Sequence, residues 1–141
     1  MGTFLEDLDD HKGYADRRLP NGQLAGGVWT SATREFTAYV AVCGCGWQAT
    51  GEHPPTEDGE EAAIDQWRSE HATPELARQA TRRREELGRV LGWLGGQANR
   101  LEDPATLERV SRALDRTQAL VDDLQRDLER EASEREAGGE R

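Results

Sequence analysis

Residues 39–53 read YVAVCGCGWQATGEH and contain both cysteines of the chain, Cys43 and Cys45. Before them, residues 36–43 alternate with a period of two and are rich in the residue types that strands favour. The residues after Cys45, at 46–51, suit a strand that runs back. This stretch therefore predicts two antiparallel strands with Cys-Gly-Cys at the turn between them.

A helix is predicted directly after these strands, over residues 57–71. Thr56 is a suitable N-cap, and the acidic side chains that follow it are favoured at the positive end of the helix dipole. Ile64, Trp67 and His71 are spaced by three and four residues, so they share one face. The order strand, strand, helix predicts a small ββα module.

The path of this module brings one histidine back to the cysteines. A return strand that starts near Cys45 carries the chain roughly 20 Å away by His53, at about 3.3 Å per residue. A helix of about 15 residues then rises roughly 22 Å in the opposite direction. We therefore expect His71 to lie beside Cys43 and Cys45, and His53 to lie at the opposite end.

Two thiolates and an imidazole are donors of the kind that structural zinc sites use. The spacing departs from the common C-x-x-C, because only Gly44 separates the cysteines. The fourth ligand would be Glu75, His11 or water, and we favour His11 because the chain offers no better soft donor. The predicted zinc ligands are Cys43, Cys45, His71 and His11.

Two other interpretations of the cysteine pair stay open. Reduced cysteines can pack beside Trp47 and Trp67, because free cysteine is commonly buried. A redox pair is the other interpretation, although no basic side chain nearby in the sequence would lower a thiol pKa.

The segment from Val28 to Leu76 resembles one found in small, mostly uncharacterised proteins of high-GC actinobacteria. These proteins combine C-x-C-G-W with a later tryptophan and histidine on a helix. The resemblance covers about a third of the chain and implies a zinc-finger-like module rather than an activity. It rests on Cys43, Cys45, Gly46, Trp47, Trp67 and His71.

A second module is predicted after Pro74, where aromatic residues and cysteine give way to arginine, glutamate and leucine. Helices are expected over residues 75–101 and 104–132, and Asp103 before Pro104 is a capping signal for the second. The link is so short that the helices should run antiparallel, as a hairpin. The apolar seams expected between them are Ala80, Leu87, Leu91, Leu94, Ala98 and Leu101 on the first helix, and Leu107, Val110, Leu114, Thr117, Val121, Leu124 and Leu128 on the second.

Three glycines lie four residues apart on one face of the first helix. Glycine costs about 1 kcal/mol relative to alanine inside a helix, so the stripe indicates close approach of another helix; a locally weakened helix is the alternative. Val90, Trp93 and Leu120 lie outside the expected seams, and this favours a homodimer. The predicted interaction surface consists of Gly88, Gly92, Trp93 and Gly96.

The sequence thus predicts an α+β chain in four parts. A short antiparallel sheet and one helix form the zinc-finger-like ββα module, and a long, coiled-coil-like helical hairpin follows it. The expected boundaries are an N-terminal arm at 1–27, the ββα module at 28–73, the hairpin at 74–133 and a disordered tail at 134–141.

Composition limits the function classes. The 141 residues carry a net charge of −10, which disfavours contact with nucleic acid or anionic membrane. No segment approaches the roughly 20 apolar residues of a membrane span, and no signal peptide is recognised, so we expect a cytoplasmic protein. The sequence shows no phosphate-binding loop and no nucleophile with a convincing base, so no enzyme is predicted.

We therefore expect a non-enzymatic protein-interaction or regulatory protein. The small module would serve as a folded, zinc-stabilised head, and the hairpin would bind a protein partner or a second copy. One alternative is a nucleic-acid-binding, zinc-finger-like regulator, which the acidic helix at 57–71 disfavours. The other is a thiol redox protein that uses Cys43 and Cys45.

Overall fold

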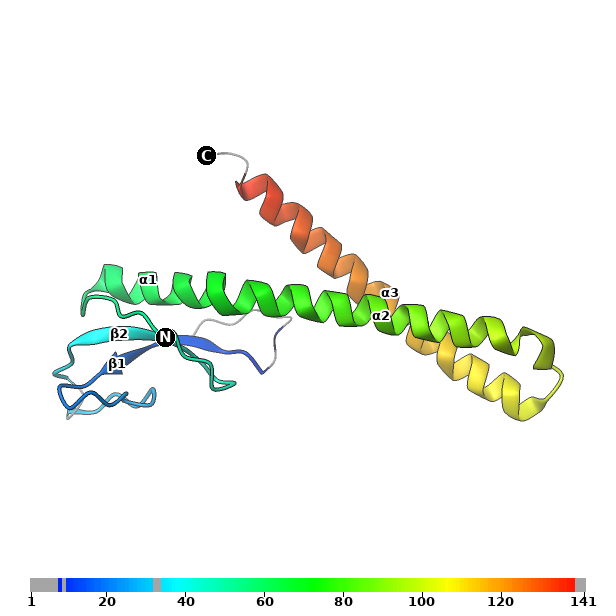
Figure 1. The fold of residues 1–141 in the computed structure, drawn as a ribbon, viewed down its shortest axis with the longest axis horizontal. Helices are drawn as coiled ribbons and strands as arrows, with labels where there is room; N and C mark the ends of the chain where they lie inside the picture. The colour runs from blue at the N-terminus through cyan, green and yellow to red at the C-terminus, as the bar shows by residue number, and fades with distance from the viewer. Residues whose placement is uncertain (1–7, 9, 32–33, 139–141) are drawn as a thin grey trace. The chain divides into compact units, whose positions relative to one another are not determined.

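The computed structural model describes residues 8, 10–31 and 34–138, and it confirms the α+β class (Figure 1). The chain divides into two compact units, the head (Met1–Ala77) and the helical unit (Arg78–Arg141). No helix in the described ranges is long and apolar enough to cross a membrane. In chain order the elements are β1 (Gly13–Arg18), β2 (Ala38–Cys43), α1 (Glu57–Trp67), a π-helical segment (Arg68–Ala72), α2 (Thr73–Gln97), a 3₁₀ turn (Ala98–Arg100) and α3 (Pro104–Gly138).

The sheet pairs β2 with β1, a strand that lies in the segment expected to be an N-terminal arm. The antiparallel register places Gly13 opposite Cys43. On its other edge, β2 bonds the returning chain only through isolated bridges to Gln48 and His53. The return strand expected at 46–51 is therefore reduced to bridges, and the arm belongs to the sheet. All six residues of β2 are buried, and its backbone is paired on both edges.

The sequence GYADRR does not predict a strand, because half of its residues are charged. In the structure these charged side chains are buried or half-buried. Nearby groups satisfy these charges. The buried Asp16 carboxylate accepts a hydrogen bond from the backbone N–H of Gly26 at 3.0 Å. The Arg17 guanidinium lies over the Trp29 ring, 4.0 Å from its centroid. The polar residues of β1 are thus compatible with a paired strand.

Helix α1 packs against the sheet through Trp67, which is fully buried. A Cβ atom at Gly13 would lie 2.0 Å from the Trp67 ring, so this close approach of helix and strand requires glycine. The buried core of the head consists of Leu8, Ala15, Tyr39, Ala41, Cys43, Ala49, Ala63, Trp67, Ala72 and Leu76.

Helix α1 begins as expected, and its hydroxyl cap at Thr56 accepts the Gly59 N–H at 3.2 Å. The expected break before Pro74 is absent, because a π-helical segment continues into α2. Within an α-helix the proline ring would clash with the carbonyl four residues earlier, at Glu70. The wider π turn, closed by a bond from the Thr73 N–H to the Arg68 carbonyl, lies at that position and keeps the chain helical.

The helical unit consists of the rest of α2 and of α3, which run antiparallel. Glu86 bonds Arg116, whereas Arg83, nearer the start of α2, bonds Asp127, farther along α3, at 2.9 and 3.0 Å. The Asp103 carboxylate caps α3, as predicted, and hydrogen bonding from Thr106 lowers the pKa of that carboxyl.

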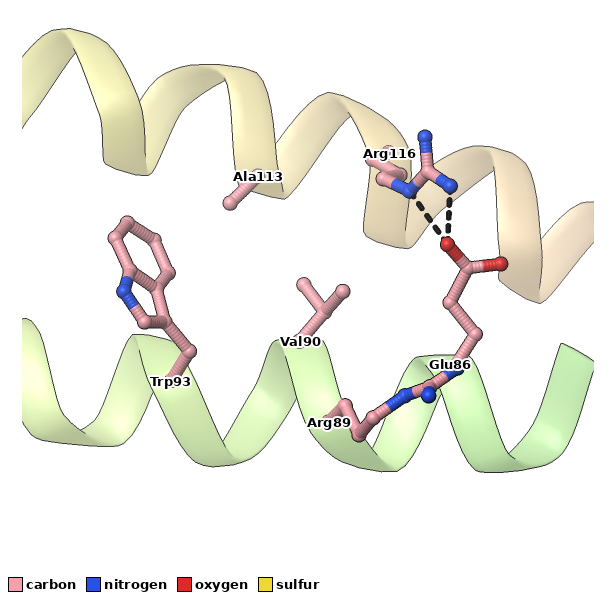
Figure 2. Close-up of a pocket in the computed structure, with 6 residues that line it drawn as sticks. All are labelled: Glu86, Arg89, Val90, Trp93, Ala113 and Arg116. Atoms are coloured by element: carbon pink, nitrogen blue, oxygen red, sulfur yellow. Dashed lines mark hydrogen bonds and ion pairs between the residues drawn. The ribbon is translucent and has the colours of Figure 1, made fainter.

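The predicted leucine seams are only partly right as the buried contact between these helices, because Ala80 is buried and Val110, Thr117 and Leu124 are half-buried, whereas other seam leucines are exposed. Figure 2 shows Val90 and Trp93 of α2 directed toward Ala113 of α3, and both residues lie outside the predicted seam. On α3 the buried residues are Thr106, Leu120 and Asp127. The physical reason is the ion pair of Asp127 with Arg83, which turns this side of α3 inward. The large apolar side chains of this unit that are exposed are Leu91, Trp93, Leu101, Leu107, Leu114 and Leu128.

The end of α3 also differs from expectation. The helix continues to Gly138, so residues 134–138 are helical rather than part of a disordered tail. Residues 139–141 of that expected tail lie outside the described residues.

Candidate metal centre

The two cysteines lie at the end of β2 and in the turn that follows it. The turn is closed by a hydrogen bond from the Gly46 N–H to the Cys43 carbonyl, at 2.9 Å. Gly46 has a φ of +98°, a conformation that favours glycine. The Cys43 N–H bonds the Trp47 carbonyl at 2.8 Å, which starts the returning chain. This local geometry leaves Cys43 buried and Cys45 exposed.

The two histidines reach the cysteines from different elements. His11 lies two residues before β1, and the pairing of Gly13 with Cys43 sets it beside the Cys-Gly-Cys turn. His71 is buried and belongs to the π-helical segment, so it reaches the turn from the helix that covers the sheet. The long-range folding of the head therefore brings these four side chains together.

The donor atoms of His11, Cys43, Cys45 and His71 all lie within 4.8 Å of one another. His11 Nδ1 is 3.0 Å from His71 Nε2, Cys45 Sγ is 3.2 Å from His71 Nε2, and Cys43 Sγ is 3.7 Å from His11 Nδ1. A tetrahedral zinc ion with Zn–N near 2.0–2.1 Å and Zn–S near 2.3 Å requires donor separations of about 3.3–3.8 Å. The cluster therefore has the size of a four-coordinate metal site.

Aromatic rings and the fold hold this cluster. The Trp47 ring stacks on His71, with centroids 4.8 Å apart and planes 12° apart. The His11 and His71 rings are tilted by 46° at 5.0 Å. Trp47 is itself half-buried against the core of the head. These ring contacts help to orient the two imidazoles.

Cys45 is exposed as a residue, but partial desolvation raises the pKa of its thiol, and its neighbour Cys43 adds to the rise. A raised thiol pKa opposes the reactive thiolate that a redox pair needs. A bound cation reverses this preference, because it stabilises thiolate directly.

His53 and Glu75 are not part of the cluster. His53 lies where the returning chain meets Tyr39, and its Nε2 is 2.8 Å from Gln66 Oε1. Glu75, which the sequence left open as a fourth ligand, is not one of the four clustered residues.

The expected interaction surface is only partly brought together. Trp93 lines a cavity of about 260 Å³ between α2 and α3, shown in Figure 2. Gly88, Gly92 and Gly96 face open space, with no atom of the described chain within 4 Å of a built Cβ. The close helix approach expected at the glycines is thus not made by α3. The exposed leucines of this unit were missed as a surface because their spacing indicated burial.

No family model matches this chain, and neither the curated proteins nor the solved structures contain a significant match. The resemblance to the actinobacterial C-x-C-G-W segment therefore stays a prediction.

Proposed function

We propose that His11, Cys43, Cys45 and His71 bind one zinc ion that stabilises the head, and that the chain is a non-enzymatic interaction or regulatory protein. The observation that carries this proposal is the cluster of four donor atoms within 4.8 Å. Two sulfurs and two imidazole nitrogens form the donor set typical of tetrahedral zinc. Oxygen-seeking ions such as Mg²⁺ and Ca²⁺ prefer other ligands.

The number of protein ligands supports a structural role for the ion. A catalytic zinc site keeps a position open for water or substrate, whereas four protein ligands fill a tetrahedral ion. The ligands come from the chain before β1, from the end of β2 and the turn after it, and from the π-helical segment. An ion bound by all four would connect three separate segments of the head, and this is how a small core gains stability from metal.

Metal analysis of the purified full chain tests the proposal. We expect roughly one zinc per chain, and Co²⁺ substitution should give the absorption bands of a tetrahedral thiolate site. Cys45→Ser and His71→Ala should each remove most of the metal. His53→Ala is the matched control, because His53 bonds Gln66 rather than the cluster, and it should retain the metal. A metal-free protein with a native near-UV spectrum would refute the zinc site.

A further inference from the structure

Four leucines of the helical unit are about half exposed. Leu91 on α2 is 51% exposed, and Leu107, Leu114 and Leu128 on α3 are 48%, 54% and 55% exposed. Single exposed leucines are common on protein surfaces, but a row with regular spacing indicates a contact surface. On α3 the row repeats every seven residues and includes the half-buried Val121.

These leucines lie on one side of the helix pair. Each of them directly follows a residue that faces the other helix: Leu91 follows Val90, and Leu114 follows Ala113. One residue along a helix is a rotation of about 100° in a fixed sense. Because α2 and α3 run antiparallel, the same rotation on both helices leads to the same side of the pair. We call this surface the leucine side; it consists of Leu87, Leu91 and Leu94 on α2 and Leu107, Leu114, Val121 and Leu128 on α3.

We propose that the leucine side binds a second copy of this chain, around a two-fold axis near Gln118. This deepens the proposed function by naming the partner of the helical unit. In an antiparallel contact between two copies of α3, Leu107 would meet Leu128 of the second copy, and Leu114 would meet Val121 of the second copy. The row is therefore complementary to itself, as an isologous two-fold interface requires.

The residues beside the leucine row on α3 are compatible with the same antiparallel contact between two copies. Ser111, Gln118 and Gln125 each follow a row residue by four positions, so they lie along its edge. All three are exposed and uncharged, and no like charges would meet along this edge. Gln118 would face Gln118 of the second copy, and amide side chains both donate and accept hydrogen bonds.

The size of the leucine side fits a dimer. From Leu107 to Leu128 the row spans roughly 32 Å, at 1.5 Å per residue, on helices about 10 Å wide. With the α2 leucines, this gives about 500 Å² for each copy. Two copies would bury on the order of 1,000 Å² in total, which is near the lower limit for a specific protein interface. A short peptide would leave much of the row uncovered, so a second copy is the better occupant.

The first test is the mass of the full chain, measured by light scattering after size exclusion. We expect about 31.4 kDa, twice the 15.7 kDa chain. Leu114→Glu should weaken the dimer at least tenfold. Because Leu114 is 54% exposed, this variant should keep its helical circular dichroism. Arg112→Glu is the matched control two residues away, on an exposed side chain off the leucine side, and it should remain dimeric.

A crosslinking test does not depend on weakening the interface. Gln118→Cys should form a disulfide-linked dimer on mild oxidation, whereas Arg112→Cys should not; both variants keep Cys43 and Cys45. A monomer at high micromolar concentration, or a dimer that neither Leu114→Glu weakens nor Gln118→Cys links, would overturn the proposal. Metal content measured on the same samples separates the two proposals. A zinc-free dimer would refute only the zinc site, and a zinc-loaded monomer would refute only the dimer.

Discussion

Trp67 and Gly13 set the distance between α1 and the sheet. The indole is fully buried, and a Cβ atom on residue 13 would lie 2.0 Å from its ring. No side-chain rotation of alanine relieves such an overlap, so either the helix or the strand must move. Since His11 lies two residues before Gly13, the same movement would disturb the cluster of histidines and cysteines.

Gly13→Ala should therefore destabilise the head by about 1–3 kcal/mol, in the range of overpacked cores. The matched control is Gly88→Ala, because a Cβ atom there meets nothing within 4 Å in the described chain. That substitution should stabilise α2 by up to about 1 kcal/mol, the difference in helix propensity. Urea unfolding, followed by circular dichroism, measures both. A stabilising Gly13→Ala would contradict the packing described for Trp67.

The residues of the candidate site were largely predictable from sequence. Cys43, Cys45 and His71 follow from the path of strand, turn and helix, which needs only approximate element lengths. His11 followed only from a lack of other soft donors, because nothing in GYADRR marks the strand that carries it into place. The donor distances depend on that strand pairing and on the π turn, and neither has a sequence pattern that predicts it.

At the scale of elements, the contact of α2 with α3 depends on one buried carboxylate. Asp127 is 1% exposed and accepts hydrogen bonds from Arg83 at 2.9 and 3.0 Å and from Arg130 at 2.6 Å. A buried charge is tolerated only when it is paired in this way. Asp127 therefore fixes which side of α3 faces α2.

Asp127→Ala should lower the unfolding free energy of the helical unit by about 2–4 kcal/mol, because it leaves Arg83 without its buried partner. The matched control is Glu131→Ala on the same helix. Glu131 meets Arg84 at 3.4 Å with both side chains more than a third exposed, so its loss should cost less than about 1 kcal/mol. Thermal unfolding of the two variants gives the comparison; equal losses would show that Asp127 does not set the contact.

The same contact explains why part of the seam, the row from Leu107 to Leu128, was predicted to be buried although it lies outside the contact. Two rows on α3 share the seven-residue spacing, one running from Thr106 to Asp127 and the other from Leu107 to Leu128. Hydrophobicity alone selects the leucine row. The structure instead buries the row that contains Asp127, because Arg83 on α2 neutralises that carboxylate. A pairing between distant helices is not visible in the local pattern of either helix.

The whole molecule combines a compact unit of mixed structure with a unit made only of helices. The two draw on different sources of stability. The head has a small core and the His/Cys cluster that could hold a metal ion, whereas the helical unit has ion pairs and a narrow apolar contact. Removal of a metal ion should therefore affect the two units unequally.

A strong chelator should unfold the head while most of the helical signal remains. A ligand present at a thousand times its dissociation constant stabilises the folded state by about 4 kcal/mol, and chelation would remove that contribution. Trp47 and Trp67 report on the head, so the near-UV signal and tryptophan emission should change. The far-UV signal of α2 and α3 should largely persist, and added zinc should restore the head. A chelated protein with unchanged near-UV signal would contradict the expectation.

Because of strand β2, the solubility of the chain depends on whether the head stays folded. Its sequence, AYVAVC, has no charge and consists largely of residues that aggregate readily as extended chains. In the folded head both of its edges are occupied, by β1 and by the bridges of the returning chain. A head that opens would present this strand to other copies. If the head binds the proposed zinc ion, a chain without metal would be open to precipitation or proteolysis, and its abundance in a cell would follow the zinc supply.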